Sequence, residues 1–162
     1  MDRIPQIRLV FALTKNDSTD FDRDAVTQRL CLTPSKTCGP MLSKGILYSD
    51  ADIHEVERDL SGITILPAES PPYHMLKHAY WSVELPKMEC WSLEEPLSRL
   101  EQILSGKECK ILSVCEDYNL CADLIVRVFA KSNSMPELTI SRSSVSYWAS
   151  MGVTIGFDFY LD

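Results

Sequence analysis

The sequence predicts an α+β domain of two layers, in which about three helices pack on a mixed, mostly antiparallel β-sheet. Two observations support this class. Apolar segments that alternate as strands do are interleaved with segments whose apolar residues recur at helical spacing. Several predicted strands also follow one another too closely for the crossover that parallel neighbours need. The 162 residues suit one domain over 1–162 with a sizeable core and an irregular insertion at about 49–78.

In the first half, the apolar residues 7–13 are rich in strand formers and predict an interior strand. Asp22 is a good N-cap for the helix that follows, and Phe21 and Val26 have the spacing of a hydrophobic staple around it. The predicted elements here are a strand at 7–13, a helix from Asp22 to about 32 with Cys31 on its inner side, a short strand at 43–48, one or two helical turns at 52–60 and an extended run at 63–66.

In the second half, residues 79–85 alternate, and Trp81, Val83 and Leu85 lie on one face of the predicted strand. Ser92 and Glu95 have the spacing of a capping box, and Gly106 is a suitable stop for the helix that they begin. The predicted elements are strands at 79–85, 110–115 and 124–129 and a helix at 92–104.

The closing residues 137–162 predict a strand at 137–141, a helix at 142–151 and a last strand at 153–160. Serines at the start of this helix can cap its free amide groups, and Gly152 can end it in a left-handed conformation. Asp158 shares a strand face with Tyr160, either as an inward carboxylate or as an outward one.

The net charge is −7 and the sequence pI is near 5, which argues against a nucleic-acid ligand because phosphates repel such a surface. The start of the chain lacks a signal-like apolar stretch, and no run approaches the roughly 18 apolar residues of a membrane span. We therefore expect a cytoplasmic protein that contacts neither nucleic acid nor membrane.

The six cysteines form no C-x-x-C pair, so we expect reduced thiols, several of them buried as small hydrophobes. His74 and His78 have a spacing that suits a metal on a helix, but prolines precede them and no third ligand is evident. The sequence also lacks a G-x-S-x-G elbow and a P-loop. We predict no metal, no cofactor and no catalytic residue.

Several segments, taken in order, resemble one family. They are Phe21 with Asp22, residues 32–37 (LTPSKT), residues 80–83 (YWSV), the leucine-rich stretch 93–104, residues 118–120 (YNL), and Met151 with Gly152, Asp158 and Tyr160. The chain resembles the bacterial domain of unknown function 4279 family over most of its length except about 49–78, which looks longer than in relatives. Some small acidic proteins of this kind are immunity proteins beside secreted toxins, so the resemblance implies a toxin domain as partner.

Two groups of acidic residues remain. Asp17, Asp20, Asp22 and Asp24 surround the first helix start. The second group lies in the insertion and consists of Asp50, Asp52, Glu55, Glu57 and Asp59. Solubility and the helix dipole explain such residues, and so does a surface that docks on a basic cleft of a partner. The second group is our candidate partner-binding site.

The functional hypothesis is a cytosolic immunity-type protein without catalytic residues, which binds a cognate bacterial toxin and neutralises it by occluding its active site. The alternative is a small-ligand-binding or regulatory domain without catalysis, whose pocket lies between sheet and helices and is lined by Trp81 and Tyr160.

Overall fold

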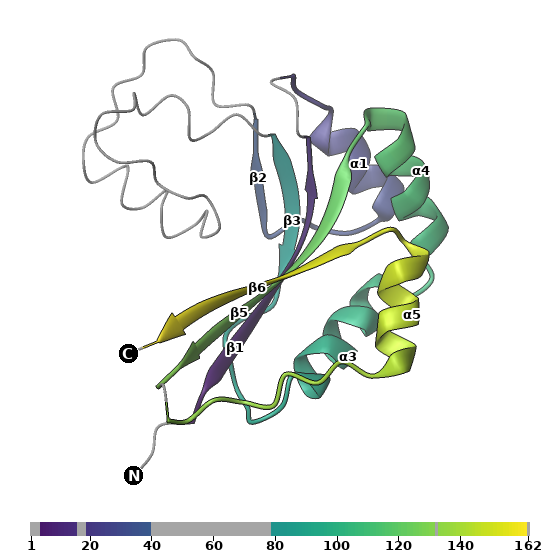
Figure 1. The fold of residues 1–162 in the computed structure, drawn as a ribbon. Coiled ribbons are helices and arrows are strands. Elements are labelled where there is room, and N and C mark those ends of the chain that lie inside the picture. The colour runs from purple at the N-terminus through teal and green to yellow at the C-terminus, as the bar shows by residue number, and fades with distance from the viewer. Residues whose placement is uncertain (1–3, 16–18, 40–78, 132, 162) are drawn as a thin grey trace, which may run out of the picture.

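The computed structural model describes residues 4–15, 19–39, 79–131 and 133–161. In chain order its elements are β1 (Gln6–Thr14), α1 (Arg23–Leu30), β2 (Lys36–Cys38), β3 (Tyr80–Glu84), β4 (Met88–Glu89), α3 (Glu94–Leu104), α4 (Glu108–Tyr118), β5 (Cys121–Ala130), α5 (Arg142–Ser150) and β6 (Thr154–Leu161). Figure 1 shows them as a sheet with helices packed on it, which confirms the α+β class. The described residues hold four helices, where about three were predicted.

The sheet has the strand order β2-β3-β1-β5-β6, and β4 pairs with the start of β1. β1 pairs antiparallel with β3, β4 and β5, and β2 pairs antiparallel with β3. Only β5 and β6 run parallel among the described strands, and α5 lies in the connection between them. The sheet is therefore mixed and mostly antiparallel, as predicted.

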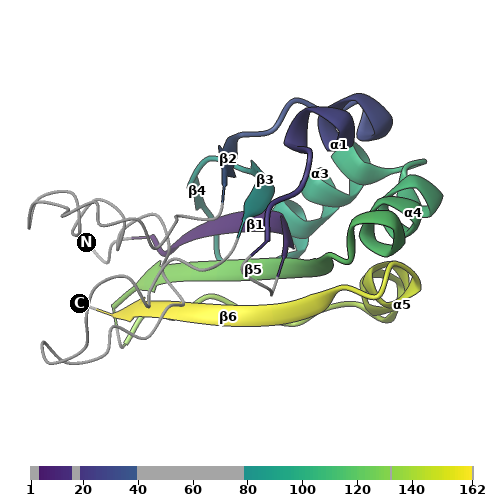
Figure 2. The same cartoon turned by 90° about the horizontal axis from the view of Figure 1, so that it is seen from above.

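The described helices lie on one side of the sheet (Figure 2). On that side β1 presents Ile7, Leu9, Phe11 and Leu13, all fully buried. The register continues this apolar face onto β3 and β5, and side chains of the helices pack against it. The other buried members include Trp81, Val83, Leu97, Leu100, Leu104, Ile111, Val114, Leu124, Val126, Val128 and Trp148. Arg8, Arg127 and Asp158 lie on the opposite face, which no described helix covers.

Local capping rules hold for α1. The side chain of Asp22 accepts a hydrogen bond from the amide of Ala25 at 2.9 Å, as an N-cap should. Phe21 and Val26 are both buried. The helix ends one or two residues earlier than predicted because Cys31 adopts the left-handed conformation, with φ of 51°. Cys31 is exposed, so its predicted inward orientation is wrong.

Helix α3 is confirmed, but the capping box is not. The N-cap is Leu93, which has no capping side chain, and the amide of Glu94 donates to the Ser92 hydroxyl at 3.2 Å. The helix begins one residue later than a box at Ser92 would require. Pro96 lies in the first turn, and Gly106 ends the segment with φ of 75°.

The strand predicted at 110–115 is wrong, because these residues belong to α4. The apolar residues of this short stretch also fit a helix. Ile111 and Val114 are buried, and Cys115 and Tyr118 pack against the same core. These four positions have the i, i+3, i+4, i+7 spacing of one helical face. Strand β5 is confirmed and is longer than predicted.

The strand predicted at 137–141 is also wrong. Only an isolated bridge between Ser92 and Glu137 forms there. Leu138 and Ile140 still pack against the core. Their alternation therefore reflects partial burial and not membership of a strand. The rest of the closing stretch is confirmed. The Ser141 hydroxyl caps α5 by accepting from the Ser144 amide at 3.2 Å, and Gly152 follows the helix with φ of 66°.

The elements predicted at 43–48, 52–60 and 63–66 lie outside the described residues, as does the insertion at 49–78. Among the residues that the structure describes, no helix is long and apolar enough to cross a membrane.

Candidate functional site

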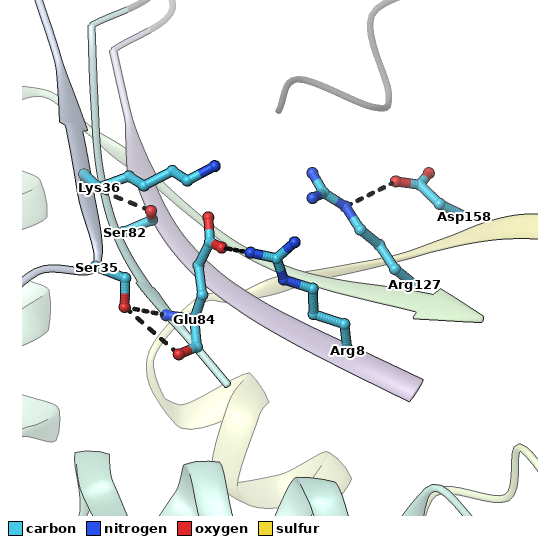
Figure 3. Close-up of polar contacts among 7 residues, drawn as sticks. All are labelled: Arg8, Ser35, Lys36, Ser82, Glu84, Arg127 and Asp158. Atoms are coloured by element: carbon cyan, nitrogen blue, oxygen red, sulfur yellow. Dashed lines mark hydrogen bonds and ion pairs between the residues drawn. The ribbon is translucent and has the colours of Figure 1, made fainter. Parts of the chain in front are cut away.

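Four charged side chains form a row across the face of the sheet opposite the helices. Arg8 of β1 lies directly opposite Arg127 of β5, and Arg127 lies beside Asp158 of β6. Glu84 of β3 completes the row beyond Arg8 (Figure 3). Two guanidinium groups thus lie side by side between two carboxylates. We call Glu84, Arg8, Arg127 and Asp158 the charge row.

The β3 end of the charge row is held by serines. Arg8 donates to the buried carboxylate of Glu84. The Ser35 hydroxyl accepts from the Glu84 amide at 2.8 Å and donates to the Glu84 carbonyl at 3.4 Å, while the Ser82 hydroxyl donates to the Lys36 carbonyl at 3.4 Å (Figure 3). These contacts fix the β2–β3 edge beneath the Arg8–Glu84 pair.

At the β6 end of the charge row the carboxylate is more exposed than at the β3 end. Arg127 Nε is 3.7 Å from Asp158 Oδ2, and their side chains are 5% and 25% exposed (Figure 3). Asp158 is therefore a half-buried ion-pair partner, which lies between the two orientations considered from the sequence. The row carries two positive and two negative charges, so its members compensate one another inside the sheet.

An aromatic pair adjoins the row. Phe129 and Tyr160 stack with ring centroids 4.7 Å apart, and Lys87 Nζ lies 3.6 Å from the Phe129 centroid. Trp81 lies on the other face, where its Nε1 donates to the Thr27 hydroxyl at 2.9 Å. Trp81 and Tyr160 are thus on opposite faces of the sheet and cannot line one pocket between the sheet and the helices.

The outer end of β6 exposes large apolar side chains. Phe157, Phe159 and Leu161 share the helix-side face with Val126 and Val128 of β5. Their exposed fractions are 38%, 48% and 54%, and Tyr160 on the other face is 37% exposed. Figure 2 shows β6 extending well beyond α5, so this helix does not cover its last residues. We call Phe157, Phe159, Tyr160 and Leu161 the β6 patch.

The β6 patch was missed from the sequence, which predicted a last strand at 153–160 but did not single out Phe157 and Phe159. They do share the face of Ile155, which packs against the core, but exposure rises toward the C-terminal end of the strand. Up to Asp158 the strand alternates apolar residues with Thr154, Gly156 and Asp158, so its sequence gives no sign of where the helix cover ends.

The candidate partner-binding residues Asp50, Asp52, Glu55, Glu57 and Asp59 lie outside the described residues. In the first acidic group, Asp17 does too.

The other members of the first acidic group have local roles. Asp22 caps α1, Asp24 lies in its first turn, and Asp20 pairs with Arg23, whose hydrogen bond lowers the pKa of the Asp20 carboxyl. Helix capping and the helix dipole account for these three residues.

All six cysteines are described and none of them forms a disulfide, but only Cys90 is buried, so the expectation of several buried thiols is wrong. Burial raises the pKa of the Cys38 and Cys90 thiols and raises that of Cys115 to about 11. These three thiols are therefore poor nucleophiles at neutral pH.

No group of three potential metal ligands occurs among the described residues, and the three histidines lie outside them.

The family model of the domain of unknown function DUF4279 matches residues 46–162, which is more than half of the chain. The chain belongs to the DUF4279 family. No curated protein and no solved structure matches it.

The matched span differs from the resemblance seen in the sequence. It runs through 49–78, which we expected the family resemblance to omit, and it leaves out Phe21, Asp22 and residues 32–37. Within the DUF4279 span lie β3 to β6, and with them Glu84, the Arg127–Asp158 pair and the β6 patch. Arg8 lies outside it, on the strand at the centre of the sheet.

Proposed function

We propose that this DUF4279 protein is an immunity-type protein of the cytoplasm, which binds a cognate toxin domain and neutralises it by occluding its active site. The observation that favours a protein partner is the β6 patch. Phe157, Phe159 and Leu161 lie in consecutive positions on one face of a strand, and each is more than a third exposed. A contiguous apolar patch on a protein surface is typical of an interaction site.

The size of the β6 patch supports this proposal. With about 200 Å² for an aromatic side chain, the exposed fractions of Phe157 and Phe159 correspond to roughly 170 Å², and Leu161 raises the area on this face to roughly 260 Å². Tyr160, on the other face, brings the total for the strand to roughly 350 Å². The largest patches on soluble monomers, which are often functional, measure about 300–600 Å². The helix-side face alone lies just below that range, and the strand with both of its faces falls within it.

Charge supports a basic partner. The described residues carry fourteen acidic and twelve basic side chains, a net of −2, whereas the whole chain has −7. The remaining residues therefore contribute −5, and Asp50, Asp52, Glu55, Glu57 and Asp59 are among them. We propose that these residues steer the chain toward a basic substrate cleft of the toxin, since opposite charge speeds association.

The first experiment measures binding of the purified chain to the toxin domain encoded beside it, by calorimetry and by inhibition of the toxin. Phe159→Ser is expected to weaken the affinity about tenfold or more, as truncation of an interface aromatic does. Leu112→Ser on α4 is the matched control, because Leu112 is 37% exposed on a helix away from β6. Equal affinities of the two variants would remove the β6 patch from the interface.

The second experiment tests the acidic residues. Asp50→Lys, Asp52→Lys and Glu55→Lys together are expected to slow association with the toxin domain, most clearly at low salt, with little change in dissociation. Stopped-flow association at two ionic strengths measures this. Association rates that match those of the unaltered chain at both ionic strengths would reject the proposed steering.

A further inference from the structure

We propose that the partner binds by adding an extended strand to the free edge of β6. This inference rests on the proposed function and specifies its binding mode. Among the strands that the structure describes, β6 is the last of the sheet order and pairs with β5 on one side only. Along its other side, alternate backbone N–H and C=O groups point outward, and such groups are a template for another strand.

The two edges of the sheet differ in how they are protected. β2 is three residues long and carries Lys36, and a short strand with a lysine discourages further pairing. β6 is eight residues long and contains no lysine, arginine or proline. Its one charged side chain, Asp158, is paired with Arg127 of its own sheet. Of the two edges that the described strands form, β6 is therefore the one more open to an added strand.

The side chains on β6 define the chemistry of that strand. On the helix-side face its residues would lie beside Phe157, Phe159 and Leu161, so alternate positions should be apolar. On the other face they would lie beside Asp158 and Tyr160, where a basic or polar side chain suits the carboxylate. No atom lies within 4 Å of a Cβ built on Gly156, which leaves room for a side chain from the added strand.

A second copy of this chain fits the edge less well. Two copies would each carry a net charge of −7 and repel each other, whereas a basic partner is attracted. A two-fold axis at Asp158 would also place the two carboxylates opposite each other. The roughly 350 Å² of the β6 patch is less than half of the roughly 800 Å² per partner in a stable interface. A separate toxin domain is subject neither to the like charge nor to the two-fold axis.

The test combines hydrogen exchange with substitution, using the full chain and the toxin domain encoded beside it. In the complex, the outward amides of Thr154–Leu161 are expected to exchange at least about tenfold more slowly than in the free chain. Phe159→Lys places a charge on the open edge and should weaken binding at least about tenfold, while Leu112→Lys on α4 should not.

The outcomes separate the two proposals. If the unaltered chain neither binds nor inhibits the toxin domain, the immunity function fails, and strand addition fails with it. If it binds and inhibits while the β6 amides exchange at their free rate, strand addition is wrong and the function stands. If the chain alone sediments as a dimer with protected β6 amides, and Phe159→Lys makes it monomeric, a second copy occupies the edge and the inference is overturned.

Discussion

At the residue scale, the Arg127–Asp158 pair allows the contribution of one charge to the free energy of unfolding to be measured. Asp158→Asn leaves Arg127, which is almost fully buried, beside Arg8 with only one carboxylate in the charge row. Removing one partner of a buried pair costs several kcal/mol, and the partial exposure of Asp158 reduces the expected loss to about 1–2 kcal/mol. The midpoint of urea unfolding measures it.

A matched control exists on the surface. Asp117 pairs with Arg29 at 2.6 Å, which is shorter than the 3.7 Å between Arg127 and Asp158. The side chains of Asp117 and Arg29 are both well exposed, however. Exposed pairs contribute about 0–1 kcal/mol, so Asp117→Asn should change stability by less than about 0.5 kcal/mol. A larger loss of stability in Asp117→Asn than in Asp158→Asn would show that burial is not what makes the Arg127–Asp158 pair stabilising.

Residue roles were predictable where the rule is local. Asp22 and Ser141 cap the helices that follow them, as their positions indicated. The partner of Asp158 was not predictable, because Arg127 lies on another strand and only the β5–β6 register brings the two together. The exposure of Phe159 likewise depends on where the helix layer ends, which no pattern within β6 records.

At the scale of elements, α4 shows where a short window misleads. Residues 110–115 are mostly apolar and include the β-branched Ile111 and Val114, which favour a strand. Over the whole of Glu108–Tyr118, the buried positions have helical spacing instead. The longer window decides the question.

The end of α4 gives a test. Asn119 has φ of 53°, a left-handed conformation that asparagine and glycine tolerate and alanine does not. Asn119→Ala should therefore lower the free energy of unfolding by about 1 kcal/mol, and Asn119→Gly should leave it unchanged or slightly higher. Thermal unfolding measures both. Asn133→Ala is the control, because Asn133 is exposed and is not among the left-handed residues. A strand at this position would show no preference for glycine over alanine.

At the scale of the whole molecule, the fold class followed from the order of apolar patterns, but the strand order did not. Short connections predicted antiparallel neighbours, and β1 proved to be central because it pairs with β3, β4 and β5. Such pairings join segments far apart in the chain, and only the packed sheet determines them. The prediction of one domain over 1–162 still needs a test.

The DUF4279 span provides that test. Residues 46–162 lack β1, which separates β3 from β5 and supplies Ile7, Leu9, Phe11 and Leu13 to the core. Without β1, the strands on its two sides lose their common neighbour and the helices lose the apolar side chains of the central strand. A chain of residues 46–162 should therefore show no cooperative thermal transition by circular dichroism, and a separate peptide of residues 1–45 should restore one. If the shorter chain unfolds cooperatively on its own, the family span is an autonomous domain and the single-domain prediction is wrong.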